Sequence, residues 1–449
     1  MSESSQDLNF QPQRRGLLAA ISALPLLVAA PMAEAKAKKP AVLAPTPPMG
    51  WNSWNSFATT INEAQALETA HIMADKLLPH GYNVFTIDIQ WYEAGANSYT
   101  YSDKPMPTMD DYGRLLPAPN RFPSGFKAIA DQVHGLGLKF GIHLMRGIPR
   151  LAVERNLPVF GTKFHAQDIA KTSSICPWNP DMYGVDMSKP GAQGYYDSVF
   201  SLYASWGVDF VKMDDMSRPY DAHAPEIEAA HAAIQKTGRG IALSLSPGET
   251  PVARADHVKK YAQMWRISDD FWDEWPLLES QFTRLENWNS HREAGHWPDG
   301  DMLPLGRLAL GQRDTKFTAA EQTTLMTLWS IARSPLIMGG DLRVLDAPTL
   351  VLLTNDEILA VNQASHDNQP HFVADGQRVW TAKAANGDDY LALFNTGDKD
   401  GDIVVDLNMV DIKGRKVRDL WTRTDLTPSS DRFVATLPSH GAGLWRLSV

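Results

Sequence analysis

The chain has 449 residues, of which 43% are hydrophobic, so it can bury a large core, and its length predicts two or three domains. A formal net charge of -10 argues against nucleic acid as a partner, because surfaces that bind nucleic acid are basic. The single cysteine, Cys176, excludes a disulfide within the chain and is typical of a small buried residue rather than a nucleophile. The 14 tryptophans suit a protein that binds sugars, although tryptophan is also ordinary core material.

The N-terminal segment has the pattern of a secretory signal. An Arg-Arg pair at 14–15 precedes an apolar run at 16–31, and Ala-Glu-Ala at 33–35 fits the small-x-small cleavage pattern. The run is shorter than the about 20 residues of a membrane span, so no stable membrane insertion is predicted. We expect a signal peptide over 1–35, a basic, Pro-rich linker over 36–47, and export to the periplasm or beyond. The paired arginines favour the twin-arginine route, with ordinary secretion or an uncleaved anchor as alternatives.

From residue 48 to 364, apolar β-type runs alternate with helical patterns. Such alternation predicts βαβ units and a parallel sheet, and seven or eight units fit a (β/α)8 TIM barrel better than an open doubly wound sheet. No Gly-rich phosphate fingerprint follows the first strand, which argues against a nucleotide site. The predicted strands are 48–54, 84–89, 139–144, 209–213, 240–245, 264–267 and 335–338, and the predicted helices are 63–78, 125–136, 191–206, 225–237 and 318–331.

Several of these strands end in polar residues. The run Val208–Met213 stops at two carboxylates, Asp214 and Asp215, with Lys212 two positions before the first. Placing a charge at the end of a buried strand costs folding free energy, so such residues indicate a function. In a barrel, the active site lies at the carboxyl ends of the strands. The polar residues at or just after the ends of the other strands are Asp88, His143, Arg266, Asp269 and Asp270.

The pattern changes near residue 365. Short alternating runs separated by Asn-, Asp- and Gly-rich turns predict an antiparallel β-sandwich over 365–449. Few acidic residues fall in these strands, so the predicted sandwich is expected to support the fold rather than form a site.

Five motifs in the barrel and their order resemble glycoside hydrolase family 27, the α-galactosidases and their relatives. The resemblance runs from about residue 45 to the C-terminus and implies a retaining β/α barrel followed by a C-terminal β-sandwich. The motifs are Met49-Gly-Trp-Asn-Ser-Trp54, Val211-Lys-Met-Asp214, Trp265-Arg-Ile-Ser-Asp-Asp270, Trp297-Pro-Asp-Gly-Asp301-Met-Leu and Ser334-Pro-Leu-Ile-Met-Gly-Gly-Asp-Leu342.

The resemblance implies that Asp214 is the nucleophile and Asp270 the general acid/base. Retaining hydrolysis needs two carboxyl groups about 5–5.5 Å apart that hold different protonation states. The sugar ligands that the resemblance implies are Trp54, Asp88, Lys212, Arg266 and Asp301. From the residues alone, alternatives stay open: Asp215 or Asp269 could react or cap a helix, Arg266 could merely pair with Asp270, and Trp54 could be packing.

Four departures from the family bear on specificity. Ile89 follows Asp88 where α-galactosidases carry a second carboxylate that serves the hydroxymethyl group of galactose. Ile cannot accept a hydrogen bond, so a hydroxyl that reaches it loses about 1–3 kcal/mol, whereas L-arabinopyranose lacks that group. His143 replaces a usual Tyr, Met216 stands where a disulfide cysteine would follow the nucleophile, and the loop 244–248 differs near the 2-hydroxyl.

The sequence therefore predicts a retaining exo-glycosidase that removes terminal α-D-galactosyl residues from oligosaccharide or polysaccharide side chains. The runner-up is a β-L-arabinopyranosidase on the same scaffold, with Ile89 and His143 in the sugar site. A non-catalytic sugar-binding barrel is a remote third, since both Asp214 and Asp270 are present. No His-rich ligand spacing predicts a metal, and the resemblance implies no cofactor.

Overall fold

The structure is a computed structural model that describes residues 42–374 and 376–449. The predicted signal peptide (1–35) and the first part of the predicted linker lie outside the described residues. In the described part of the chain, no helix is long and apolar enough to cross a membrane.

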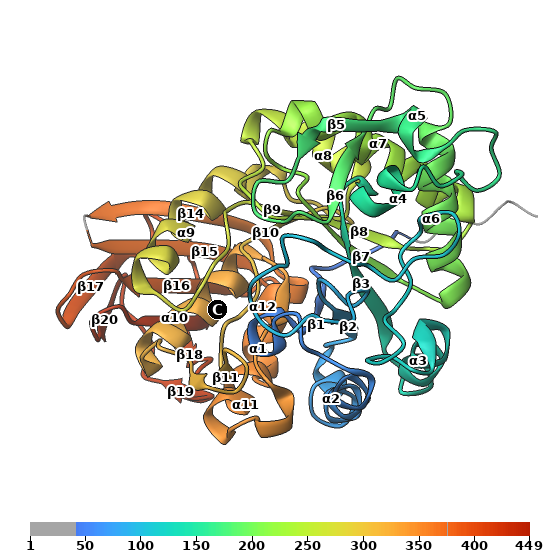
Figure 1. Ribbon diagram of the computed structural model, residues 1–449. Coiled ribbons are helices and arrows are strands. Elements are labelled where there is room, and N and C mark those ends of the chain that lie inside the picture. Colours follow the sequence, from blue (N-terminus) through green and yellow to red (C-terminus); the bar gives the residue numbers. More distant parts are fainter. Residues whose placement is uncertain (1–41, 375) are drawn as a thin grey trace, which may run out of the picture. The chain divides into compact units, whose positions relative to one another are not determined.

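A sheet of eight parallel strands forms a TIM-like barrel (Figure 1), with the hydrogen-bonded order β10-β9-β8-β7-β3-β2-β1-β13. Directly after β10, Leu303 forms a parallel bridge with Met338 of β13, which links the two ends of the sheet. The strands are β1 (Met49–Asn52), β2 (Val84–Ile87), β3 (Lys139–Met145), β7 (Phe210–Asp214), β8 (Ala242–Leu245), β9 (Met264–Arg266), β10 (Trp297–Asp299) and β13 (Leu336–Met338). The predicted barrel is therefore confirmed.

The barrel strands are connected by helices whose apolar faces pack against the sheet. Helix α2 begins with a capping box between Asn62 and Gln65, and it buries Ala66, Ala70 and Met73 at helical spacing. The helices are α1 (Trp54–Phe57), α2 (Glu63–Lys76), α3 (Gly125–Gly135), α6 (Ala192–Trp206), α7 (Tyr220–Thr237), α8 (Ala255–Tyr261), α9 (Trp275–Trp288), α10 (Ala319–Ala332), α11 (Ala347–Leu353) and α12 (Asp356–Ala364).

The connection from β3 to α6 contains a small sheet of its own, which the sequence did not predict. Its strands pair in the antiparallel order β4-β6-β5, and the β5–β6 loop lines the cavity described below. The elements are β4 (Ile148–Pro149), α4 (Arg150–Glu154), α5 (Ala166–Ile169), β5 (Ala170–Ile175) and β6 (Met182–Val185). A further two-stranded ribbon, β11 (Arg307–Leu308) and β12 (Arg313–Asp314), follows β10.

The C-terminal region is an antiparallel β-sandwich, as predicted (orange to red in Figure 1). A six-stranded sheet of order β14-β15-β16-β21-β18-β19 faces the pair β17-β20 across an apolar core that includes Leu393, Val405 and Phe433. The strands are β14 (His366–Ala374), β15 (Gln377–Lys383), β16 (Asp389–Asn395), β17 (Gly401–Asp406), β18 (Lys416–Asp419), β19 (Thr424–Leu426), β20 (Arg432–Leu437) and β21 (Ala442–Ser448).

Barrel helices and sandwich strands share one hydrophobic core. Helix α10 contacts β14, β15, β16 and β21, and the ring of Phe282 on α9 lies 5.0 Å from that of Phe394 on β16. Trp421 Nε1 donates a hydrogen bond to Thr327 Oγ1 at 2.9 Å. The same continuous cluster of buried apolar side chains therefore runs from the barrel into the sandwich.

Candidate active site

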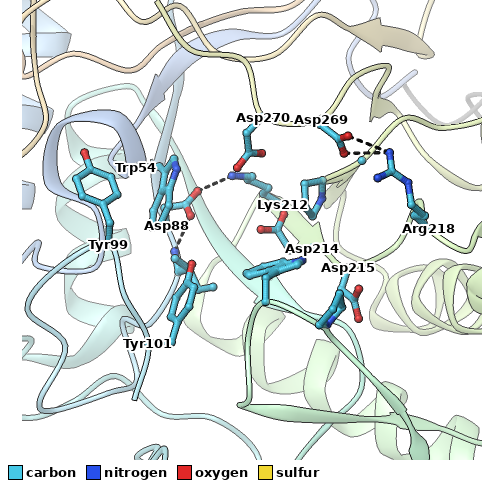
Figure 2. Close-up of a pocket in the computed structure, with 15 residues that line it drawn as sticks. Trp54, Asp88, Tyr99, Tyr101, Lys212, Asp214, Asp215, Arg218, Asp269 and Asp270 are labelled. Carbon is cyan, nitrogen blue, oxygen red and sulfur yellow. Dashed lines mark hydrogen bonds and ion pairs between the residues drawn. The ribbon is translucent and has the colours of Figure 1, made fainter. Parts of the chain in front are cut away.

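The nine predicted site residues converge at the carboxyl-terminal end of the barrel strands. A cavity of about 510 Å³ opens there, and Figure 2 shows acidic side chains from several strands gathered around it. Six of the nine line this cavity: Trp54, Asp88, Ile89, Lys212, Asp214 and Asp270. The other three, His143, Arg266 and Asp301, lie in the wall, where they contact Asp214, Asp270 or each other.

Asp214, the last residue of β7, is buried and held by three groups. His143 Nε2 lies 2.9 Å from its Oδ2, Ser246 Oγ donates a hydrogen bond to its Oδ1, and Lys212 is close by. Burial raises the pKa of this carboxyl, but the charges of Lys212 and His143 and the two hydrogen bonds outweigh it and hold the pKa well below its usual range. Asp214 is therefore ionised at neutral pH, as a nucleophile must be.

Asp88 and Lys212 form a buried ion pair at the inner end of the cavity. Lys212 Nζ lies 2.9 Å from Asp88 Oδ2, which also accepts a hydrogen bond from Asn52 Nδ2 at 2.7 Å, and the backbone N–H of Ile89 donates to Asp88 Oδ1 at 2.8 Å. Burial raises the pKa of Asp88, but the charges of Lys212 and His143 and the hydrogen bond from the N–H of Ile89 together outweigh it, so the pKa lies below its usual value. Both side chains are thus charged and fixed, which suits them to orient sugar hydroxyls.

Asp270 lies on the opposite side of the cavity and is the more solvent-exposed carboxyl, with 54% of its side chain accessible. Its Oδ1 is 3.2 Å from the guanidinium of Arg266, whose NH2 group also lies 2.8 Å from Asp301 Oδ2. Arg266 is therefore shared between two carboxylates and is not simply the partner of Asp270. The exposure leaves this carboxyl accessible to water, which a general acid/base needs.

The neighbouring acids have structural partners. Asp215 binds Arg146, with NH2 to Oδ2 at 2.7 Å, and adopts a left-handed backbone conformation with φ 62°. Asp269 forms an ion pair with Arg218 at 3.0 Å (dashed in Figure 2), and its side chain is 68% exposed. Neither residue caps a helix. The geometry thus favours Asp214 and Asp270 as the reactive pair.

Several residues that the sequence analysis missed complete the site. Ser246 lies in the loop 244–248, whose position at the end of β8 could have identified it. Tyr99, Tyr101 and Trp178 line the cavity from loops, where no strand end marks them in the sequence.

Burial, and next the charge of Asp301, raise the pKa of Asp299 to about 7, so this carboxyl beneath the site is partly protonated at neutral pH. Across the described residues, no cluster of side chains suited to a metal ion occurs.

Sequence profiles match both parts of the chain. The profile described as "Alpha galactosidase A" matches residues 46–186 and 181–364, and that of the "Alpha galactosidase C-terminal beta sandwich domain" matches residues 374–447. The chain belongs to glycoside hydrolase family 27. The resemblance seen in the sequence motifs is thereby confirmed.

Relatives of this family 27 glycosidase include α-galactosidases and a β-L-arabinopyranosidase. Alpha-galactosidase 3 of Arabidopsis thaliana is 30% identical over 422 residues, covering 90% of this chain and 82% of the relative. The solved structure of a GH27 β-L-arabinopyranosidase from Geobacillus stearothermophilus is 48% identical, with a TM-score of 0.89 over 90% of this chain and 97% of that one. A Bacillus halodurans protein, provisionally described as an α-N-acetylgalactosaminidase, is also 48% identical, with a TM-score of 0.81 over 90% and 97% of the two chains.

Proposed function

We propose that this family 27 glycosidase is a retaining, exo-acting β-L-arabinopyranosidase. The observation that carries the proposal is Ile89, which is 2% exposed and lines the cavity beside the Asp88–Lys212 pair. The expectation from the sequence placed α-galactosidase first, whereas the structural relatives support the runner-up better. One relative with 48% identity is a β-L-arabinopyranosidase, a variant of which has been solved with arabinose, and another with 48% identity is provisionally described as an α-N-acetylgalactosaminidase. The α-galactosidases compared are about 30% identical or less.

Ile89 leaves the cavity wall without a hydrogen-bond acceptor at this position. L-Arabinopyranose has the ring stereochemistry of galactose without the hydroxymethyl group. A galactosyl unit would place its 6-hydroxyl against the Ile89 side chain, where the lost hydrogen bond costs about 1–3 kcal/mol. An arabinopyranosyl unit presents only a ring CH₂ to the same surface and loses nothing.

The proposed reaction uses two steps. Asp214 attacks the anomeric carbon while Asp270 protonates the leaving oxygen, which gives a glycosyl ester on Asp214. Asp270 then takes a proton from water, which attacks the same carbon and releases the Asp214 carboxylate. The ion pair of Asp88 and Lys212 orients the ring hydroxyls throughout, and Arg266 positions the carboxyl group of Asp270. The first product seen by NMR should keep the anomeric configuration of the substrate, and early inversion would exclude this mechanism.

The substrate assignment is tested with three nitrophenyl glycosides that differ only in the sugar: β-L-arabinopyranoside, α-D-galactopyranoside and N-acetyl-α-D-galactosaminide. We expect kcat/KM for the arabinopyranoside to exceed that for the galactoside by about tenfold or more, since 1.4 kcal/mol is one decade. The Asp214→Asn variant serves as a control for contaminating activity. An equal or higher value for either galactose-derived substrate would refute the assignment and leave the family chemistry intact.

We also propose that the enzyme acts outside the cytoplasm, from the Arg-Arg pair at 14–15 and the cleavage pattern at 33–35. Cell fractionation with N-terminal sequencing of the mature protein tests this proposal. The double variant R14K/R15K should stop export if the route depends on twin arginines, and an uncleaved N-terminus in the cytoplasmic fraction would contradict it.

A further inference from the structure

The cavity has an inner and an outer half of different character. The inner half is buried and charged, and it contains Asp88, Lys212 and Asp214. The outer half is lined by exposed or half-buried residues that include Tyr101 and Trp178. A volume of about 510 Å³ is in the range of pockets that hold ligands larger than one pentose. The outer half therefore has room for a second group attached to the hydrolysed sugar.

Two aromatic rings from different loops form one wall of this outer half. Trp178 is 37% exposed although it is a large apolar side chain, and its ring lies 5.8 Å from that of Tyr101 at an interplanar angle of 49°. Burial, and next the charge of Asp214, raise the pKa of Tyr101, so its phenol keeps its proton and can donate a hydrogen bond. An exposed indole beside a phenol offers an apolar face together with a polar edge.

The loop that carries Trp178 is anchored by a buried carboxylate. Asp181 is 1% exposed and accepts hydrogen bonds from Tyr92 Oη at 2.6 Å and from Gln90 Nε2 at 3.1 Å. Its backbone N–H donates to Asn179 Oδ1 at 2.8 Å. These contacts tie the β5–β6 loop to the segment after β2, so the backbone near Trp178 is anchored before any ligand arrives, which lowers the entropy cost of binding.

We propose that Trp178 and Tyr101 form a subsite for the leaving-group sugar, whose apolar ring face stacks on the indole of Trp178. The inference rests on the glycosidase activity proposed above, and it extends the substrate to a chain in which a second pyranose carries the terminal unit. The opposite side of the outer half carries the exposed ion pair of Arg218 and Asp269, which can bond the hydroxyls on the edge of that ring. Asp270 lines the same cavity, and in this proposal it protonates the bridging oxygen as the leaving sugar departs.

The test compares two substrates whose leaving groups are both alkoxides: methyl β-L-arabinopyranoside, which has no second ring, and a disaccharide with a terminal β-L-arabinopyranosyl unit. The ratio of their kcat/KM values isolates the outer subsite. Trp178→Ala should lower the disaccharide-to-methyl ratio by about tenfold, the order of the loss expected from removing one large stacking side chain. Trp178→Phe should keep most of the ratio, and Tyr101→Phe should lower it less than Trp178→Ala does.

A matched control is Phe160→Ala, which removes another exposed aromatic that does not line the cavity and should leave the ratio unchanged. An unchanged ratio in folded Trp178→Ala would overturn the proposal, as would an equal loss for both substrates, which would mean that Trp178 only shapes the inner site. If Trp178→Ala does not fold, the same ratio is measured for Trp178→Phe and Tyr101→Phe.

If galactosides prove to be the better substrates, the same ratio is measured with methyl α-galactoside and an α-galactosyl disaccharide. The sugar assignment and the subsite can therefore fail separately.

Discussion

At the residue scale, the two adjacent aspartates at the end of β7 have different partners. Asp214 is buried among Lys212, His143 and Ser246, whereas Asp215 is bound by Arg146. The residues alone could not separate them, because both are aspartates at the same strand end and Arg146 lies 69 positions away from Asp215; only the family motif favoured Asp214. The fold adds that Asp215 is bound by Arg146, whereas Asp214 is left among Lys212, His143 and Ser246.

The catalytic pair is predicted to respond differently to removal. Asp214→Asn should abolish turnover of every substrate, and added azide should not restore a product of retained configuration. Asp270→Ala should still release nitrophenolate, because a good leaving group needs little protonation, while it loses activity on alkyl glycosides. Burst and steady-state kinetics with both substrate types measure this difference. Normal turnover by Asp214→Asn together with an inactive Asp215→Asn would show that the nucleophile has been misplaced.

Ile89 is predicted to control the choice between pentose and hexose. Ile89→Asp supplies an acceptor for the 6-hydroxyl, so the ratio of kcat/KM for α-galactoside over β-L-arabinopyranoside should rise by about tenfold, one decade for 1.4 kcal/mol. Ile89→Leu keeps the apolar surface and should leave the ratio near its original value. A well-folded Ile89→Asp variant with an unchanged ratio would remove the support for the pentose assignment.

His143 is predicted to set the acid limb of the activity profile. Its charge helps to keep the pKa of Asp214 low, so the neutral variant His143→Gln should let that pKa rise. A higher pKa means that Asp214 becomes protonated, and inactive, at a higher pH. The acid limb of kcat/KM should therefore move upward in pH while the plateau activity changes less. The control His231→Gln, in which a histidine that contacts Tyr261 is changed, should not move it. An unmoved limb in His143→Gln would show that the charge of His143 does not act on the nucleophile.

At the element scale, one arginine joins β3, β7 and α7 beneath the site. The backbone N–H of Arg146, the residue after β3, donates to Asp214 O at 3.0 Å, and its guanidinium binds both Asp215 and Glu226 of α7 at 2.7 Å. Glu226 also accepts a hydrogen bond from Tyr196 Oη of α6 at 2.5 Å. This buried network holds the end of β7 in register, and with it Asp214, the proposed nucleophile.

Breaking this network should lower the stability of the protein. Arg146→Met leaves two buried carboxylates without their cation, which is expected to lower the free energy of unfolding by about 3–5 kcal/mol. Denaturant unfolding followed by tryptophan fluorescence measures the loss. The control Lys127→Met breaks an exposed i,i+4 pair with Asp131 and should cost no more than about 0.5 kcal/mol. A loss as small as the control's would mean that the network contributes little to stability.

The elements that the sequence predicted are those with clear apolar periodicity, and the missed ones lack it for physical reasons. Strand β5 is mostly exposed, so it has no buried face to detect. In α9 the helical pattern is interrupted by Gln281, which is buried because it donates to Ser268 Oγ at 2.9 Å. Helix α7 begins at Tyr220, five residues before Pro225, although a proline normally marks the first turn of a helix. Among the site residues, those at strand ends could be predicted, whereas Trp178, in a loop of a sheet that was not foreseen, could not.

At the scale of the whole molecule, the sandwich is bound to the barrel through a common core. Thr324 Oγ1 of α10 donates to His440 O at 2.6 Å, and the ring of Trp275 on α9 stacks on His440 with centroids 3.8 Å apart. Together with the Phe282–Phe394 contact, these interactions join apolar side chains that neither part could bury alone.

The full-length protein is therefore predicted to unfold in a single calorimetric transition. Trp421→Ala, which removes a partly buried side chain and its hydrogen bond to Thr327, should lower the stability of the whole molecule by about 2–3 kcal/mol. Differential scanning calorimetry should show one peak that moves as a unit. The control Met409→Ala, at an exposed position of the sandwich, should leave it in place. Two separate peaks, of which only one moves, would show that barrel and sandwich unfold independently.

The pairing of β1 with β13 also constrains how the chain can be made. Trp51 Nε1 donates to the carbonyl of Gly340, a partner 289 positions further along the chain. At about 5–20 residues per second, a ribosome needs about 15–60 s to deliver that partner after β1 has been synthesised. Throughout this time one edge of the nascent sheet lacks its neighbour and can pair with other chains. A twin-arginine route, which carries folded cargo, would confine this vulnerable interval to the cytoplasm, where chaperones can cover the open edge until the barrel closes.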